Sequence, residues 1–198
     1  MPVEEIEYNN FADFWNKEHR KHSESALSGH SLTEHLLRLN VQVRPTDDVL
    51  CIGVGMGDWI RDMGARKWAL DISQVALDSV QEVVMGCVRM PEMLPKEQFD
   101  FAMSLWVAPH MTDRDLEQQI CQVVRSLKPT GIFAMQYCEA HGEATGDDYD
   151  IAIAGGIERA RETVMKMVDN AGSVATVAYV LPRLQYSLNE ITLHIKRK

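Results

Sequence analysis

The sequence has a shortage of basic residues and no long apolar run. It has 20 Lys and Arg against 29 Asp and Glu, so its formal net charge is −9. Because binding along a nucleic acid depends on Lys and Arg that displace counterions, this balance argues against nucleic acid and anionic membranes as partners. No apolar run approaches the ~20 residues that cross a bilayer, and the first residues lack the basic and apolar regions of a secretory signal. We therefore expect a cytoplasmic protein.

The four cysteines are spread too far apart for the usual metal or disulfide patterns. Cys51, Cys87, Cys121 and Cys138 form no C-x-x-C pair and have no histidine at metal-ligand spacing. Three of them, Cys51, Cys87 and Cys138, fall in apolar runs typical of buried strands, where a thiol acts as a small apolar side chain. We therefore expect free thiols in a reducing compartment and no metal site.

The composition is that of one ordinary globular domain. The 198 residues are 45% apolar and 25% charged, which is average for globular proteins. Strand-like apolar runs alternate with helical patterns, which indicates βαβ units and a mostly parallel sheet. The last two strands are too close for a helical crossover, so they should pair antiparallel. The expected strands are 48–54, 67–73, 83–89, 99–107, 132–138, 173–181 and 187–197, and the expected helices are 10–22, 31–40, 57–64, 74–81, 113–127 and 157–170.

The first of these strands runs into three glycines, in the stretch VLCIGVGMG at residues 49–57. A strand, a glycine turn and a helix start place bare backbone at the carboxyl edge of the sheet, where open α/β folds bind ligands. Gly53, Gly55 and Gly57 could also serve only a tight turn. Asp58 follows at the start of the next helix, and its carboxylate would repel a pyrophosphate there. This disfavours a nicotinamide-dependent oxidoreductase and favours a nucleoside without phosphate, such as S-adenosylmethionine.

The order of the motifs from about Asp48 to the C-terminus resembles the class I S-adenosylmethionine-dependent methyltransferases, especially the small single-domain members that act on small molecules. The likeness rests on VLCIGVGMG, ALDIS, FDFAMSLWVAPHM, LKPTGIFAMQY and the closing pair of strands. It implies an α/β fold with a Rossmann-like seven-stranded mixed sheet of order 3-2-1-4-5-7-6, strand 7 being antiparallel, and helices on both faces. It also implies a single domain, with residues 1–44 as an N-terminal helical lid on the core of residues 45–198.

The resemblance further implies a function and a set of binding residues. The protein should transfer a methyl group from S-adenosylmethionine to oxygen or nitrogen of a small polar molecule, as a monomer or homodimer. Gly53, Gly55 and Gly57 should lie along the methionyl and ribose parts of the cofactor. Asp71 should accept hydrogen bonds from both ribose hydroxyls, unless it is only a surface acid beside the next helix. The other expected cofactor contacts are Ile72, Cys87, Val88 and Arg89 around the adenine, Ser104 and Leu105 near the reactive methyl group, and Trp15 from the lid.

Methyl transfer from a sulfonium needs an aligned acceptor and a base for its proton, and histidine is the usual base near neutral pH. His110 follows the fourth strand and His141 the fifth, so both are expected on loops at the ligand edge, although His110 could be structural. Tyr8, His30 and Trp106 are expected to touch the acceptor, with Trp106 either a wall of the pocket or part of the core.

Three features depart from the family pattern. Cys51 stands where the family usually has an acid that supports the glycine turn and the cofactor's amino group. GCVRMP replaces an acid that often follows the third strand, and the span from Gly57 to Asp71 is about one helical turn short. These departures leave a second hypothesis open, a non-catalytic cofactor-binding or scaffolding protein of the same fold. The acidic stretch 139–150 is also open between a solvated loop and a gate that favours cationic or polar acceptors.

Overall fold

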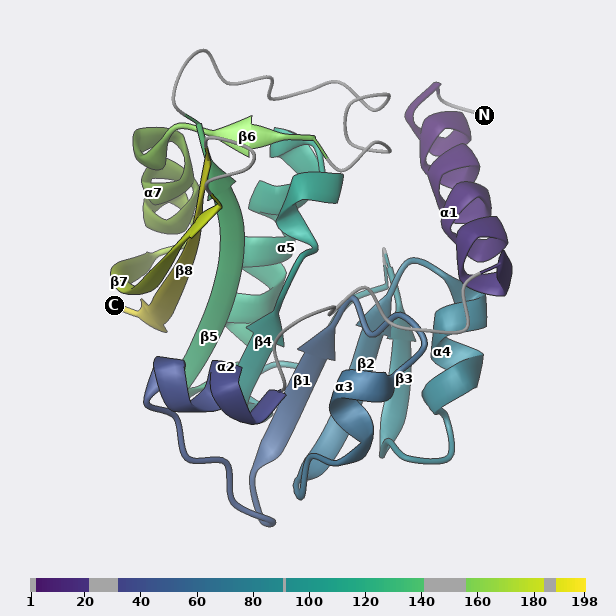
Figure 1. The fold of residues 1–198 in the computed structure, drawn as a ribbon, viewed down its shortest axis with the longest axis horizontal. Helices are drawn as coiled ribbons and strands as arrows, with labels where there is room; N and C mark the ends of the chain where they lie inside the picture. The colour runs from purple at the N-terminus through teal and green to yellow at the C-terminus, as the bar shows by residue number, and fades with distance from the viewer. Residues whose placement is uncertain (1–2, 22–31, 91, 141–155, 184–187) are drawn as a thin grey trace.

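A single eight-stranded sheet runs through the molecule, and helices cover both of its faces (Figure 1). The structure is a computed structural model, and it describes residues 3–21, 32–90, 92–140, 156–183 and 188–198. The strands are β1 (Asp48–Ile52), β2 (Arg66–Asp71), β3 (Gly86–Arg89), β4 (Phe99–Ser104), β5 (Leu127–Glu139), β6 (Glu158–Arg159), β7 (Ser173–Arg183) and β8 (Leu188–Arg197). The helices are α1 (Val3–Lys21), α2 (Leu32–Leu39), α3 (Asp58–Arg61), α4 (Gln74–Val80), the 3-10 turn η1 (Ala108–His110), α5 (Asp113–Ser126) and α7 (Arg161–Asn170).

The strand order is β3-β2-β1-β4-β5-β8-β7, and the short strand β6 pairs with β5. Strands β3, β2, β1, β4 and β5 run parallel to their neighbours, whereas β8 lies antiparallel between β5 and β7. Strands β7 and β8 are the sixth and seventh strands of the sequence prediction. The expected order 3-2-1-4-5-7-6, the antiparallel last strand and the fold class are therefore confirmed.

Three predicted helix boundaries are wrong, one of them at α3, which ends at Arg61 rather than at residue 64. The helix expected over 157–170 begins only at Arg161, because Glu158 and Arg159 form β6. The backbone N–H of Ala140 donates to the carbonyl oxygen of Arg159 at 2.9 Å, and the Arg159 side chain is completely buried. Glu158 and Arg159 therefore pair with β5 as a short strand instead of forming the first turn of the helix. At the other end of the chain, α1 extends back to Val3 rather than beginning near residue 10.

The two faces of the sheet carry separate apolar cores. On β1, Leu50 and Ile52 belong to the core shared with α5 and α7, and Val49 and Cys51 belong to the core shared with α2, α3 and α4. This alternation follows from the opposite directions of successive side chains in a strand. Both faces of the central strands are thus buried, as expected for a parallel sheet.

The expected burial of the strand cysteines is correct for Cys51 and Cys138 and wrong for Cys87, which is exposed. Strand β3 is at one end of the sheet and has a single neighbour, β2. Its alternating burial leaves Gly86 half-buried, Cys87 exposed and Val88 buried. An apolar run at an edge strand therefore does not guarantee burial of each side chain.

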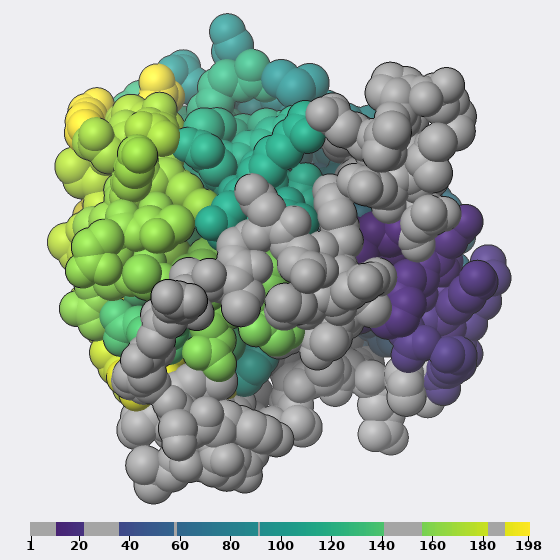
Figure 2. Space-filling view, turned by 90° about the horizontal axis from the view of Figure 1, so that it is seen from above, coloured from purple at the N-terminus to yellow at the C-terminus, as the bar shows by residue number. Residues whose placement is uncertain are grey.

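The carboxyl ends of β1, β2, β4 and β5 meet at the edge that Figure 2 views from above, with α1 in purple at one side and β6 and α7 in green at the other. This is the edge at which parallel sheets bind ligands. Among the described residues, no helix is both long enough and apolar enough to cross a membrane.

Candidate functional site

The glycine turn after β1 has left-handed backbone at each of its three glycines, with φ of +66° at Gly53, +53° at Gly55 and +84° at Gly57. A Cβ on Gly53 would overlap the side chain of Val107, and one on Gly57 would overlap that of Val80. Packing alone therefore requires those two glycines. A Cβ on Gly55, in contrast, would meet no described residue within 4 Å. The turn therefore leaves open space beside Gly55.

The backbone of Gly55 is held on both sides although its Cα faces open space. Its N–H donates to Oδ2 of Asp71 at 3.3 Å, and its carbonyl oxygen accepts from the hydroxyl of Ser79 at 3.3 Å. The tip of the turn is thus fixed by neighbouring side chains, with its bare side turned outward. A ligand can approach this backbone more closely than it could approach any residue with a side chain.

Asp71 ends β2 and is buried, with 5% of its surface exposed. Its Oδ1 accepts the N–H of Ser73 at 2.9 Å, and its Oδ2 accepts the N–H of Gly55. Burial raises the pKa of Asp71 above its ordinary value, while these hydrogen bonds and the charge of His19 act in the opposite direction. Each carboxylate oxygen keeps a further lone pair for another donor. Asp71 is therefore not the surface acid of the alternative interpretation.

The N-terminal helix α1 is attached beside this edge. The side-chain oxygen Oδ1 of Asn16 accepts from the Ser73 hydroxyl at 2.9 Å and from the N–H of Val75 at 3.3 Å, which ties α1 to the start of α4. The rings of Trp15 and His110 meet edge to face, with centroids 4.8 Å apart and planes at 88°. The helix therefore connects the end of β2 with the loop after β4. Sequence reasoning predicted this helix as a lid but missed the contribution of Asn16.

A family model described as a methyltransferase domain matches residues 50–135. The matched segment extends from β1 into β5 and contains the glycine turn, Asp71 and His110. Residues 50–135 are thus similar to a methyltransferase domain. This match agrees with the methyltransferase interpretation made from the sequence.

Solved methyltransferases share this fold at low sequence identity. The Burkholderia thailandensis 1,6-didemethyltoxoflavin-N1-methyltransferase has a TM-score of 0.67 and 15% identity, covering 96% of this chain and 87% of its own. The Streptomyces coelicolor A3(2) geranyl diphosphate C-methyltransferase has a TM-score of 0.67 and 14% identity, and the match covers 100% of this chain and 98% of that enzyme. The Haemonchus contortus phosphoethanolamine N-methyltransferase 2 has a TM-score of 0.64 and 16% identity. The match covers 84% of this chain, which spans only 52% of the length of that enzyme. These likenesses show the fold, and no curated protein sequence matches the chain.

The residues expected around the adenine lie in three different environments. Arg89 donates from Nε to the carbonyl oxygen of Ile72 at 3.3 Å, so both residues are next to Asp71. The sulfur of Cys87 lies 3.8 Å from the carbonyl oxygen of Leu77 in α4. Val88 packs in the core on the α5 face. The structure thus brings Ile72 and Arg89 together at the edge, while Cys87 faces α4 and Val88 faces the core.

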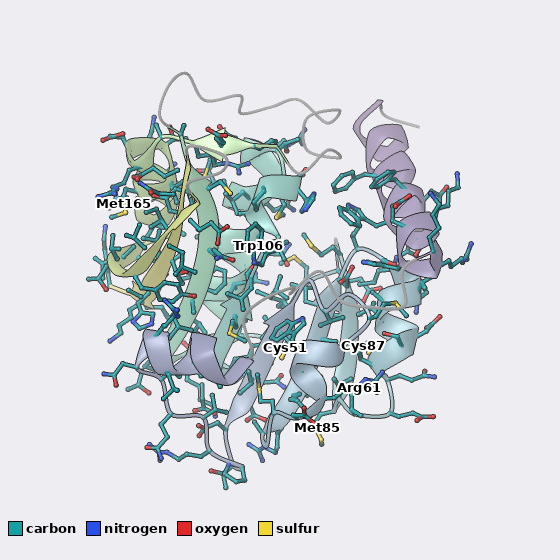
Figure 3. All side chains as sticks on the ribbon, in the orientation of Figure 1. Cys51, Arg61, Met85, Cys87, Trp106 and Met165 are labelled. Carbon is teal, nitrogen blue, oxygen red and sulfur yellow. The ribbon has the colours of Figure 1, made fainter. Side chains whose placement is uncertain are left out.

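Ser104 and Leu105, expected near the reactive methyl group, are both buried at the tip of β4. The Ser104 hydroxyl is fully enclosed and has no hydrogen-bond partner among the described residues. Leu105 packs in the core on the α2 face. The following residue, Trp106, is half-buried, and Figure 3 shows it above the end of β4, near the middle of the edge.

Arg159 is a structural residue of the site that sequence reasoning placed in a helix. Its fully buried guanidinium donates to Asp113 Oδ1 at 2.7 Å, to the carbonyl oxygen of Ala108 at 2.8 Å and to that of Met111. These partners flank His110 on both sides, so Arg159 fixes the loop that carries this histidine. The sequence around Arg159 does not predict this structural role, because the residues that it hydrogen-bonds are about 50 positions away.

Several predicted site residues fall outside the described part of the structure. His30, His141 and most of the acidic stretch 139–150 are outside it, and so is the side chain of Tyr8. Within the described ranges, no three His, Cys, Asp or Glu residues are grouped as metal ligands would be.

Proposed function

We propose that this protein transfers a methyl group from S-adenosylmethionine to an oxygen or nitrogen atom of a small polar molecule. The observation that carries the proposal is the open side of Gly55 directly beside the buried carboxylate of Asp71. The similar structures are named for N-, O- and C-methylation of small molecules, such as 1,6-didemethyltoxoflavin and geranyl diphosphate. We also propose a cytoplasmic location, following the sequence analysis.

The residues at the edge suit the two ends of this cofactor. The bare backbone of Gly53 to Gly57 would lie along its methionyl and ribose parts, and Asp71 would accept from the two ribose hydroxyls through its remaining lone pairs. Ile72 and Arg89 would lie on the adenine side. When bound, the cofactor supplies an electrophilic methyl group on a sulfonium. The charge of that sulfonium suits an edge that carries the buried carboxylate of Asp71.

The chain itself has to align the acceptor and take its proton. In the transfer, a lone pair of the acceptor atom forms the new bond to the methyl carbon, and the carbon–sulfur bond breaks with its electrons on sulfur. The acceptor proton passes to a base, for which we propose His110 or His141. His110 fits this role because Arg159 and Trp15 hold its loop and its ring in place. The proposed acceptor contacts are Tyr8, His30 and Trp106, and Trp15 is the proposed contact of α1 with the cofactor.

Titration calorimetry with S-adenosylmethionine and S-adenosylhomocysteine tests the proposal. Asp71→Ala should weaken the affinity for both by about tenfold or more, because two ribose hydroxyls would lose their acceptor. Asp78→Ala is the matched control, since it removes an exposed carboxylate from α4 that hydrogen-bonds only Gln74 in the described structure. Equal affinities for Asp71→Ala and the wild type would refute the placement of the cofactor.

The same measurement decides between the enzyme and the non-catalytic alternative. Absence of binding of either compound at millimolar concentration would leave the scaffolding hypothesis. Binding, followed by formation of S-adenosylhomocysteine with a small acceptor, supports the enzyme. His110→Ala should lower that turnover without a matching loss of cofactor affinity if His110 takes the proton.

A further inference from the structure

Trp106 has an unusual backbone conformation for a large residue, with φ of +60°. In the described part of the chain, the other non-glycine residues with positive φ are Asn40 and Glu97. Asparagine adopts this region readily, whereas for a bulky side chain it is a strained outlier. Such strain persists only where the surrounding structure holds it, and it is concentrated at functional sites.

A chain of two buried polar side chains holds Trp106 in this conformation. The N–H of Trp106 donates to Oε1 of Gln136 at 3.1 Å, and Nε2 of Gln136 donates to Oε2 of Glu190 at 3.1 Å. Gln136 is 2% exposed and Glu190 is 1% exposed. Because Oε2 of Glu190 accepts from Nε2 of Gln136 while Oε1 of Gln136 accepts from Trp106, the two contacts together set which end of the Gln136 amide faces Trp106. With the amide reversed, two donors would face each other.

This pair lies at the height where β4 ends. Met135 pairs with Ser104 at the tip of β4, and β5 continues to Glu139 beyond it. Glu190 is paired with Cys138 on this extension, and Gln136 lies two residues earlier on the same face. The Glu190–Gln136 pair therefore stands beside the ligand edge of the sheet rather than in the middle of the core.

Trp106 is also directly connected to the glycine turn. Ile52, the last residue of β1, pairs with Ser104, so the turn and Trp106 follow neighbouring strand ends. Val107, the residue after Trp106, fills the space that a side chain on Gly53 would occupy. A change in the backbone at Trp106 would therefore move Val107 relative to the glycine turn.

Resting on the proposed function, we propose that Glu190 acts through Gln136 as a positioning residue for Trp106, which forms the wall of the site beside the transferable methyl group. Glu190 orients the amide, the amide accepts the strained N–H, and the indole is thereby fixed at the edge above β4 (Figure 3). The acceptor then meets a rigid aromatic surface, whose position is set by two residues that touch neither cofactor nor acceptor.

Fluorine NMR of protein labelled with 5-fluorotryptophan tests the placement without a known acceptor. The chain has four tryptophans, and Trp106→Phe identifies the Trp106 signal. The Trp106 signal should differ between the S-adenosylmethionine and S-adenosylhomocysteine complexes, which differ by the methyl group, while the Trp68 signal should not. If calorimetry shows no binding of either compound to the wild type, the proposed function fails and the inference with it. If both bind and the Trp106 signal is the same in the two complexes, the inference alone is overturned.

The positioning role is tested by Glu190→Gln, which lets the Gln136 amide face either way. The Trp106 signal should shift or split, whereas Glu139→Gln, which removes a carboxylate one strand away that pairs with Arg161, should leave it unchanged. The fall in melting temperature caused by Glu190→Gln should be smaller in the Trp106→Gly background, where positive φ carries no strain. Gln136→Met provides the same comparison if Glu190→Gln does not fold. An unchanged Trp106 signal together with equal falls in both backgrounds would overturn the role.

Discussion

The open side of Gly55 makes a prediction with a close internal control. Gly55 and Gly172 both have positive φ, +53° and +68°, and within the described part of the chain a Cβ on either would meet nothing within 4 Å. Gly172 precedes β7 near Lys198, at the opposite edge of the sheet from the glycine turn. Changing each to alanine therefore imposes the same backbone strain, and only the change at Gly55 places a methyl group in the proposed cofactor site.

The expected loss of stability is the same for both variants. Alanine at positive φ costs about 1 kcal/mol, which lowers the melting temperature of a domain of this size by about 2–4 °C. Gly57→Ala should lose more, because its Cβ would also overlap Val80, and overpacking adds about 1–3 kcal/mol. Thermal unfolding of the three variants measures these differences.

The affinity for S-adenosylhomocysteine should separate the two matched variants. Gly55→Ala should weaken it by about tenfold or more, which corresponds to about 1.4 kcal/mol, because the new methyl group occupies space that the ligand needs. Gly172→Ala should bind as the wild type does. Calorimetry at a temperature where both variants are folded makes the comparison. Wild-type affinity in Gly55→Ala would refute the inference that the ligand lies against this glycine.

Three other predictions follow from burial and charge. Burial raises the pKa of Asp71 above its ordinary value of 3.8, so the affinity for S-adenosylhomocysteine should fall on acidification with a midpoint above pH 3.8. Binding measured across pH should show this dependence in the wild type and not in Asp71→Asn. Arg159→Met should lower the free energy of unfolding by about 4 kcal/mol or more, from three charge-assisted hydrogen bonds at about 1.5 kcal/mol or more each. Arg161→Met, which breaks the ion pair of a half-exposed arginine, should cost below about 1 kcal/mol in urea unfolding. Iodoacetamide should alkylate the exposed Cys87 and spare Cys51, whose pKa burial raises to about 12, as peptide mass mapping can show.

The parts of the fold that could be predicted are those with local signals. The apolar run of β1, the three glycines after it and the acid at the end of β2 each occupy a few consecutive residues, and their order specifies the topology. The caps of α4 and α5 are equally local, because Ser73 and Thr112 accept from backbone N–H groups three residues later. The sequence predicts these features because the conformation of each depends on neighbouring residues alone.

The parts that could not be predicted depend on partners far away in the sequence. Arg159 lies in a stretch with helical periodicity, and only the carbonyl groups of the loop around His110 explain why it leaves the helix and joins the sheet. Asn16 is polar and part of an amphipathic helix, so nothing local shows that it accepts from Ser73. The exposure of Cys87 depends on β3 being at the end of the sheet, which is a property of the topology rather than of the run.

The departure at Cys51 can now be judged from the contacts around the glycine turn. Burial raises the pKa of Cys51 to about 12, so this residue supplies no negative charge. Lys67, the nearby cation, donates instead to two carbonyl groups at the end of α3, at 2.9 and 3.1 Å. The turn itself is held by Asp71 at the N–H of Gly55 and by Ser79 at its carbonyl oxygen. These contacts support the turn without an acid at Cys51, so the substitution does not weaken the turn itself.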